Sequence, residues 1–316
     1  MPIDLPAVVG EGLAGCRDGV LLAVSGGRDS TAMLHAAAGR AALVATVDHG
    51  LREGSADDAA FVAGQCGTLG VECVTLAVSP ASASEDDCRA ARYEALRSLA
   101  EKRGLRWVAV AHTADDQAET VLHRIARGTG VAGLAGMPRT RDLGGGVSLV
   151  RPLLRVRRAD VTAWLESRGL SWREDPTNAG GDYTRGRLRN EVLPLLREAV
   201  NRRADGALTR LAASAAEYAA VVAGLAGRLL AEASRGASLE CRVLRTAEPL
   251  LRREVLRLWW RRLGLPERGM SEARWRDAAS VLDADGPANC DLPGGVRLSR
   301  SGGVVTARRP DGAGTR

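Results

Sequence analysis

The sequence predicts an α/β protein, in which a doubly wound, mostly parallel sheet is followed by a smaller C-terminal domain of helices and strands. Three observations support this fold. Short apolar runs recur in the first third of the chain, helix-length segments separate them, and the last third is Ala/Leu-rich and closes with paired glycines. Continuous apolar runs are typical of strands that are buried on both faces, as in a parallel sheet.

Four apolar runs predict the strands of that sheet, at residues 19–24, 43–47, 71–78 and 107–111. Between and after them lie helix-length segments, at residues 30–38, 55–69, 85–103 and 115–126. Ser84 precedes the third of these helices as an N-cap, and acidic residues follow it in the first turn. Ligands of doubly wound sheets bind beyond the carboxyl ends of the strands. We therefore expect residues 25–30, 48–52 and 112–119 to be neighbours in space.

Glycine marks the next segment, because residues 128–146 read GTGVAGLAGMPRTRDLGGG and predict a loop across the mouth of the sheet. Residues 151–154 are expected to be extended, and residues 158–168 to form a short helix. We place a boundary near residues 201–205, which gives an N-terminal domain, 1–204, and a C-terminal domain, 205–316. The elements expected after the boundary are helices at 207–234, 249–263 and 271–282, then three short strands around the glycine pairs 294–295 and 302–303.

Charge is divided unevenly along the chain. The net charge is +6, and 43 of the 44 basic residues are Arg, a bias that a GC-rich coding sequence also produces. Residues 1–138 hold 12 basic and 17 acidic side chains, net −5, whereas residues 139–316 hold 32 and 21, net +11. A mildly acidic half joined to a strongly basic half indicates a catalytic part and a part that holds a polyanion.

Several classes of protein are excluded by simpler features. No run approaches 18 apolar residues, and the N-terminus lacks the basic and apolar regions of a signal peptide. The six cysteines are scattered and none forms C-x-x-C, so neither a zinc ribbon nor a clustered iron–sulfur site is expected. We therefore expect a cytoplasmic protein with reduced thiols and no membrane contact.

The strongest motif is Ser-Gly-Gly-Arg-Asp-Ser at residues 25–30, directly after the first strand. Its glycines let the backbone approach a phosphate, and the helix N-terminus that follows offers free N–H groups to an anion. Ser25 and Ser30 add hydroxyl donors, whereas Asp29 suits a hard cation such as Mg²⁺ that bridges phosphates. The Walker pattern G-x-x-x-x-G-K-[ST] is absent. The plainer interpretation is a Ser/Gly turn capped by Asp29.

This loop resembles the pyrophosphate loop of the N-type ATP pyrophosphatases, which have an adenine nucleotide alpha hydrolase-like fold and split ATP between the α and β phosphates. Later segments resemble the signatures of one branch, the tRNA(Ile)-lysidine synthetases. These segments are VDHGLR at 47–52, RAARY at 89–93, AHTADDQAET at 111–120, RGTG at 127–130, RPLL at 151–154 and EDPTN at 174–178. The match runs in order from about residue 19 to 198, and the closing LPGGVRLSR resembles that family's C-terminal domain. The resemblance implies that residues 1–204 form the ATP pyrophosphatase catalytic domain and that residues 205–316 form a tRNA-binding domain.

The resemblance implies a ligase that acts in two steps on the wobble cytidine of a CAU-anticodon tRNA(Ile). ATP adenylates the C2 oxygen of the base, and the ε-amine of free L-lysine then displaces AMP. The products are lysidine, AMP and pyrophosphate, and the codon that is read changes from AUG to AUA. ATP is the expected co-substrate and Mg²⁺ the expected cofactor, and members of this family are often dimeric.

Carboxylates suit this reaction, because a lysine amine arrives charged and must lose a proton before it attacks. Asp116 and Glu119 share one helix face at i, i+3 and are expected to bind lysine. The resemblance implies that Asp29, Arg92, Asp116 and Glu119 are catalytic and that Asp29 and Asp115 hold the metal. An acidic first turn favoured by the helix dipole also explains Asp115 and Asp116, but not Glu119.

The nucleotide contacts follow from the loop and from the next strand end. The predicted ATP-binding residues are Ser25, Gly26, Gly27, Arg28, Asp29, Ser30, Asp48 and His49. Arg92, or Arg89 one turn before it, would stabilise charge on the α-phosphate during adenylation. An exposed basic helix face explains the two arginines equally simply. His112 follows the fourth strand as His49 follows the second, and neither histidine is assigned a proton transfer.

Arg185, Arg187 and Arg189 are predicted to contact the tRNA, because guanidinium groups bind phosphates and stack on bases. The related enzymes often carry Arg-Asn where this chain has Arg185-Gly186, so the register of these arginines stays open. A solvated helix face is the plainer interpretation for any one of them.

Two other functions remain open. A tRNA thiolase would keep the ATP loop, but it typically needs paired cysteines, which this chain lacks. A non-catalytic RNA-binding protein would have no need for the intact acidic and hydroxyl residues of the loop and of the helix-length segment 115–126. Pyrophosphate release that depends on both tRNA and lysine would separate the three functions.

Overall fold

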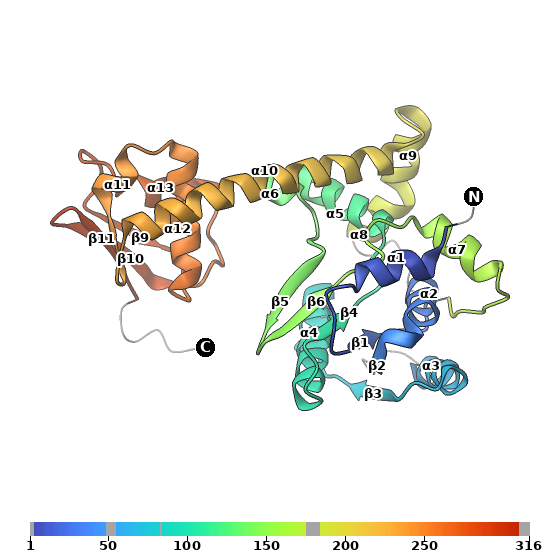
Figure 1. Ribbon diagram of the computed structural model, residues 1–316. Coiled ribbons are helices and arrows are strands. Elements are labelled where there is room, and N and C mark those ends of the chain that lie inside the picture. Colours follow the sequence, from blue (N-terminus) through green and yellow to red (C-terminus); the bar gives the residue numbers. More distant parts are fainter. Residues whose placement is uncertain (1–2, 49–54, 83, 175–183, 310–316) are drawn as a thin grey trace. The chain divides into compact units, whose positions relative to one another are not determined.

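The computed structural model describes residues 3–48, 55–82, 84–174 and 184–309 (Figure 1). The chain forms two compact units, Met1–Ala215 and Ala216–Arg316. The division between them falls inside the long helix α10 (Ala204–Ala233), whereas the boundary predicted from the sequence coincides with the start of that helix.

The first unit contains a six-stranded sheet in the order β3-β2-β1-β4-β6-β5. All its pairs are parallel except β5–β6. The strands are β1 (Val20–Ala23), β2 (Ala41–Asp48), β3 (Cys73–Ala77), β4 (Trp107–Ala109), β5 (Thr140–Gly144) and β6 (Val147–Val150). This sheet confirms the predicted doubly wound, mostly parallel fold. The strand order reverses between β1 and β4, and ligands bind at such a switch point in open α/β sheets.

Helices precede, connect and follow the strands of this sheet, and those between the parallel strands lie where the sequence predicts them. They are α1 (Leu5–Gly12), α2 (Arg28–Ala37), α3 (Ser55–Leu69), α4 (Glu85–Lys102), α5 (Ala114–Ala126), α6 (Val131–Leu134), α7 (Arg158–Glu166), α8 (Thr184–Arg187), the π-helical segment η3 (Leu188–Val192) and α9 (Leu193–Ala199). The Ser84 side chain accepts a hydrogen bond from the Asp87 amide at 3.2 Å, which confirms Ser84 as the N-cap of α4.

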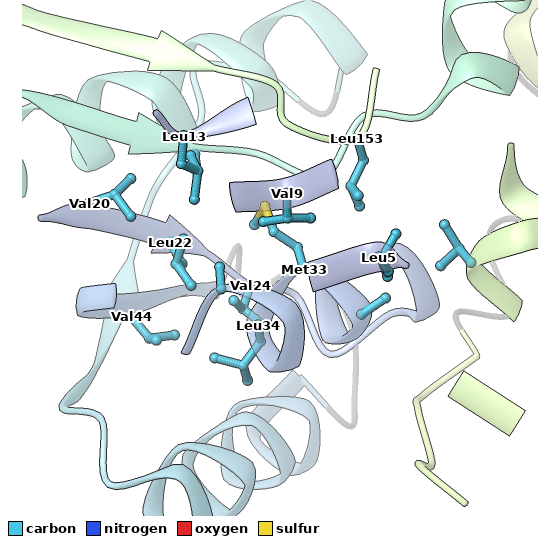
Figure 2. Close-up of a cluster of buried hydrophobic side chains, with 14 of the residues drawn as sticks. Leu5, Val9, Leu13, Val20, Leu22, Val24, Met33, Leu34, Val44 and Leu153 are labelled. Atoms are coloured by element: carbon cyan, nitrogen blue, oxygen red, sulfur yellow. The ribbon is translucent and has the colours of Figure 1, made fainter. Parts of the chain in front are cut away.

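Neighbouring residues of β1 point to opposite sides of the sheet and enter two different cores. Leu22 packs with Val9 of α1 and Met33 of α2 (Figure 2). Leu21 instead joins the cluster that contains Leu96 of α4. Because helices cover both faces, a polar face is not needed, and the strand is apolar throughout.

The segment 128–146, which the sequence predicts as a loop, is partly ordered into helix α6 and strand β5. Strand β5 forms the antiparallel edge of the sheet, and its sequence, Thr-Arg-Asp-Leu-Gly, lacks a continuous apolar run because the strand is largely exposed. Residues 151–154 form turns rather than the predicted extended segment, and the amide of Val156 donates to the carbonyl of Leu153 at 2.8 Å.

The second unit has an antiparallel sheet of five strands in the order β7-β8-β11-β10-β9. Its elements beyond α10 are β7 (Ser234–Arg235), β8 (Ser238–Glu240), α11 (Cys241–Arg245), α12 (Pro249–Arg262), α13 (Glu272–Ser280), β9 (Asn289–Leu292), β10 (Val296–Ser301) and β11 (Val304–Arg308). The core includes Trp260 and Trp275, whose ring centroids lie 5.5 Å apart in an edge-to-face arrangement. Helices α12 and α13 and the last three strands match the prediction, whereas β7, β8 and α11 are too short to leave a sequence pattern.

Within the parts of the chain that the structure describes, no helix combines the length and apolar character needed to cross a membrane.

Candidate active site

The motif at residues 25–30 forms a compact loop between β1 and α2. The Ser25 amide donates to the Ser30 hydroxyl at 3.1 Å, and this hydroxyl donates to the Gly27 carbonyl at 2.9 Å. Gly26 has a φ of +79°, which a residue with a side chain adopts only at a cost. Gly27 is the N-cap of α2, and no side chain in the described residues caps this helix end. Amides of the first turn therefore face an anion-binding position.

Arg173, which is far from this loop in the sequence, forms backbone contacts with it. The amide of Arg173 donates to the Gly26 carbonyl at 2.9 Å, and Gly27 and Arg173 form an isolated parallel bridge. Thr31, which is buried, donates its hydroxyl to the same Gly26 carbonyl at 3.0 Å. The loop is therefore fixed by hydrogen bonds before any ligand binds.

Three carboxylates meet beside this loop around one guanidinium group. Arg158 places Nη2 2.8 Å from Oδ1 of Asp116, Nε 3.4 Å from Oδ2 of Asp29 and Nη1 3.6 Å from Oε1 of Glu119. The sequence predicts no role for Arg158, which stands at the start of α7. The carboxylates come from α2 and α5, so the fold brings together residues that are about ninety positions apart.

Arg189 adds a second guanidinium group to the same cluster. Its Nε and Nη2 donate to the two carboxylate oxygens of Glu119 at 2.6 and 2.8 Å, a bidentate arrangement. The Glu119 side chain is only 5% exposed, whereas that of Arg189 is 32% exposed. Arg189 lies in the π-helical segment η3, and such segments often occur at functional sites.

Asp116 is held by the N-terminal capping box of α5. Its Oδ2 accepts hydrogen bonds from the Thr113 amide at 2.8 Å and the Thr113 hydroxyl at 2.9 Å. Burial opposes ionisation of Asp116, but Arg158 and these hydrogen bonds outweigh it, so its pKa lies below the usual value. Burial raises the pKa of Asp29, although Arg158 partly offsets this effect. The two carboxyl groups thus differ in acidity within one cluster.

Asp115 binds the backbone of Arg158, whereas Asp116 binds its side chain. Its Oδ2 accepts the backbone N–H of Arg158 at 2.7 Å. This contact ties the first turn of α7 to the first turn of α5. It therefore fixes the backbone from which the Arg158 side chain extends.

A buried arginine contacts His112, the residue that precedes the capping box of α5. Arg151, which is buried, donates from Nε to Nδ1 of His112 at 3.1 Å and from Nη1 to the Pro138 carbonyl at 2.7 Å. Burial lowers the pKa of His112 to about 3, and repulsion from Arg151, Arg89 and Arg92 adds to this effect against the attraction of Asp116. His112 is therefore neutral at physiological pH.

The glycine-rich segment after α5 is fastened to that helix by a buried amide. Gln117 accepts the Met137 amide at 2.7 Å, and its Nε2 donates to the carbonyls of Met137 and Ala135 at 3.1 and 3.3 Å. Arg124 donates to the carbonyls of Gly133 and Gly136 at 2.7 and 2.8 Å. The segment is thus held in one conformation beside α5.

The structure brings together Asp29, Asp116 and Glu119 from the predicted set, and it places Arg92 on α4 with its guanidinium 5.5 Å from the centroid of the Tyr93 ring. Asp48 ends strand β2 and is half-buried. His49 and the EDPTN residues 175–178 lie outside the described residues, and so does the side chain of Arg185.

The predicted RNA-contacting arginines occupy two different environments. Arg187 is exposed and lies 3.5 Å from Glu191, whereas Arg189 points into the acidic cluster. Arg158 was missed because it stands in a run with Arg155 and Arg157, and nothing in the run distinguishes the one that turns inward.

The residues fit Mg²⁺ only in combination with phosphate. Among the described residues, no group of three or more His, Cys, Asp or Glu side chains could hold a metal ion by itself. Mg²⁺ commonly binds through one or two carboxylates, water and substrate phosphates rather than in an all-protein cage. Asp29, at the phosphate loop, is the carboxylate placed for that mode.

Comparison with known proteins gives two family matches. A PP-loop domain family matches residues 14–196, and a TilS substrate binding domain family matches residues 239–305. The chain is 39% identical over 303 residues to the tRNA(Ile)-lysidine synthase of Salinispora tropica, covering 92% of this chain and 91% of the relative. It is 40% identical over 313 residues to the synthase of the same name from Methylobacterium sp., covering 92% and 89%.

Among solved structures, the chain is similar to the U34-tRNA thiolase NcsA from Methanococcus maripaludis, with a TM-score of 0.55. This similarity covers 67% of this chain and 78% of the thiolase at 17% identity, so it supports the fold alone. The phosphate loop and the acidic cluster both lie within the part of the chain that the PP-loop family matches, and the identity to the synthases extends over both units. The chain therefore belongs to the tRNA(Ile)-lysidine synthase family.

Proposed function

We propose that this protein uses ATP to join free L-lysine to C2 of the wobble cytidine of a CAU-anticodon tRNA(Ile), giving lysidine, AMP and pyrophosphate. The observation that carries the proposal is the joining of the phosphate loop to Asp116 and Glu119 through Arg158, in a chain related to the synthases over 92% of its length. An anion site and a cation site thus adjoin, as ATP and lysine require.

On the nucleotide side, the amides of the loop and the hydroxyls of Ser25 and Ser30 bind the phosphates of ATP. Mg²⁺ supplies charge neutralisation of those phosphates, with Asp29 as its protein ligand and Asp115 as a second candidate. Asp48 stands at the end of β2, where the nucleotide is expected, and with His49 it completes the proposed ATP contacts.

On the amine side, Asp116 and Glu119 bind the ammonium group of lysine. Asp116 is suited to this role because its pKa is below the usual value, so it is ionised at physiological pH. The attacking amine must lose its proton, and a carboxylate cluster next to the reaction centre provides an acceptor within reach.

The developing charge on the α-phosphate is stabilised by arginine. Arg92 and Arg89 both lie close enough to His112 to lower its pKa, which places their charge beside α5. Preorganised donors aimed at charge that develops in the transition state commonly contribute about 100- to 1000-fold in rate. We assign this role to Arg92, with Arg89 as the alternative.

The tRNA is held by the basic half of the chain, including the unit that contains the family's substrate binding domain. Arg185 and Arg187 contact its phosphates or bases. We propose that Arg189 contacts the RNA where it enters the site beside the acidic cluster. We place the reaction in the cytoplasm, and we propose a homodimer on the basis of the family resemblance.

The proposal is tested by incubating the full chain with a tRNA(Ile) transcript, ATP, Mg²⁺ and radiolabelled lysine. We expect label in the tRNA and release of AMP and pyrophosphate in equal amounts. A thiolase would release pyrophosphate without any requirement for lysine, and an RNA-binding protein would release none. Failure to label the transcript across a range of salt concentrations would overturn the proposal.

A further inference from the structure

Arg158 makes the contacts that an incoming ammonium group would need. Its guanidinium lies 2.8 Å from Asp116 and 3.6 Å from Glu119, the two residues proposed to bind lysine. The side chain is 19% exposed, and those of Asp116 and Glu119 are 18% and 5% exposed. A substrate amine therefore cannot reach these carboxylates in the same way while Arg158 remains there.

The charges in the cluster also oppose lysine binding while Arg158 remains in place. Three guanidinium groups offset the three negative charges of Asp29, Asp116 and Glu119, because Arg28 lies 3.3 Å from Asp29 and Arg158 and Arg189 pair with the other two carboxylates. A further cation gains little from carboxylates that are already paired, because the guanidinium groups already present reduce the attraction available to it. Lysine binding thus requires that one guanidinium group move away from the acidic pair.

The phosphates of bound ATP would attract the Arg158 guanidinium away from the acidic pair. The same guanidinium lies 3.4 Å from Asp29, the carboxylate of the phosphate loop, so it already spans the two halves of the site. Phosphates bound to the loop would bring several negative charges to this side, and Arg forms bidentate contacts with phosphate readily. Rotation of this long side chain would exchange its carboxylate partners for phosphate partners.

The backbone of Arg158 is held by contacts that do not involve its guanidinium group. Its amide is held by Asp115 at 2.7 Å, and its carbonyl accepts the Thr162 hydroxyl at 3.0 Å. Both contacts involve backbone atoms and do not depend on where the guanidinium points. Residue 158 can therefore serve as a fixed pivot between the two substrate positions.

We propose that Arg158 is a positioning residue that occupies the lysine site in the substrate-free protein and moves to the phosphates when ATP binds. ATP binding then raises the affinity for lysine, and by thermodynamic linkage lysine raises the affinity for ATP by the same factor. This inference rests on the proposed function, and it adds a coupling between the two small substrates.

The test is lysine binding to the full chain with tRNA(Ile) transcript and Mg²⁺, measured by equilibrium dialysis. The nucleotide is absent or is α,β-methylene ATP, which cannot be split between the α and β phosphates. We expect the analogue to tighten lysine binding at least about 5-fold in the unaltered protein, the lower end of usual coupling factors. In Arg158→Gln, lysine should bind without nucleotide about as tightly as it does to the unaltered protein with the analogue.

Arg157→Gln is the matched control, because Arg157 is the preceding residue, is 73% exposed and pairs with Asp160 rather than with the cluster. It should keep the full coupling factor. Arg158→Lys retains the positive charge without the planar guanidinium group, so it should fold even if Arg158→Gln does not. Its coupling factor should fall between that of the unaltered protein and that of Arg158→Gln.

Three results would overturn the inference. One is a lysine affinity in the unaltered protein that does not change with the analogue. Another is unchanged coupling in Arg158→Gln and Arg158→Lys, and the third is weaker lysine binding in both variants under both conditions, which would make Arg158 only a structural support. If the unaltered protein labels tRNA with lysine while any of these results is obtained, the coupling fails and the proposed function stands.

Discussion

The Nε atom of Arg151 lies 3.1 Å from Nδ1 of His112, so the histidine accepts a hydrogen bond there and carries its proton on Nε2. An arginine that donates to an imidazole nitrogen excludes a proton from that nitrogen. Burial is the main cause of the pKa of about 3 for His112; the attraction of Asp116 opposes it, and repulsion from Arg151, Arg89 and Arg92 adds to it. His112 is thus a neutral donor through Nε2.

From this we predict that His112 does not titrate between pH 5 and pH 8. The unfolded chain takes up this proton near pH 6.5 and the folded chain near pH 3, so between these values the unfolded state holds more protons. The free energy of unfolding therefore falls as the pH is lowered through that window, by up to about 1.4 kcal/mol per pH unit.

Nitrogen-15 NMR of labelled histidine checks this directly, since it reports tautomer and titration for each imidazole. The His112 signals should keep the Nε2–H pattern throughout pH 5 to 8. In His112→Gln the free energy of unfolding should depend less steeply on pH in the same range. A His112 midpoint near 6.5 would contradict the prediction.

Glu119→Gln tests the lysine site from the carboxylate side. Removing one charge from a buried site weakens a charge-assisted hydrogen bond of about 1.5–3 kcal/mol, so the KM for lysine should rise roughly 10- to 100-fold. The KM for ATP should change little, because Glu119 faces Arg158 and Arg189 rather than the phosphate loop. Steady-state labelling of tRNA at varied lysine and ATP gives both constants.

Glu94→Gln is a suitable control, because Glu94 is 64% exposed and pairs with Arg97 on the same helix. It removes the same charge and should leave both constants unchanged. A lysine KM that stays normal in Glu119→Gln would show that the amine binds elsewhere.

Much of the site was predictable because its signals are local. The phosphate loop joins a glycine pair, two serines and an aspartate within six residues, and the strands before it and after it are continuous apolar runs. Asp116 and Glu119 are one helical turn apart, so a shared face follows from the helix period alone. Each of these inferences needed only a few neighbouring residues.

The features that the sequence does not predict depend on the tertiary structure. Arg158 differs from Arg157 only in where the first turn of α7 points it, inward to Asp116 in one case and outward to Asp160 in the other. Arg189 is predicted to contact the tRNA, and its place in the acidic cluster could not be foreseen because the sequence does not show that η3 packs against α5. Strand β5 was expected to be loop because an exposed edge strand needs no apolar pattern.

The basic half of the chain predicts a salt-dependent affinity for tRNA. If about five phosphates are neutralised, the logarithm of the affinity should fall with the logarithm of salt concentration at a slope near −3 to −5. Arg187→Gln should reduce this slope by about 1. Filter binding of labelled tRNA(Ile) between low and physiological salt measures it.

Arg103→Gln provides the comparison for that experiment, because Arg103 pairs with Glu72 at 2.6 Å within the acidic half. Its slope should match that of the unaltered protein. A slope near zero would remove the argument for a polyanion on the basic half.

Alanine substitutions at three glycines of the glycine-rich segment distinguish the cost of backbone strain from the cost of a steric clash. Gly136 has a φ of +65°, and a Cβ there would stand 2.6 Å from the Gln117 side chain. Gly128 has a similar φ of +71° with open space around it, and Gly130 has open space with an ordinary φ. Gly128→Ala should cost about 1–2 kcal/mol, the usual penalty for a left-handed residue with a side chain. Gly136→Ala should cost more, because it also displaces the amide that holds Met137. Gly130→Ala should cost least, and thermal unfolding of the three variants should follow this order. Equal losses for Gly128→Ala and Gly136→Ala would show that Gln117 yields without cost and does not fasten the segment to α5.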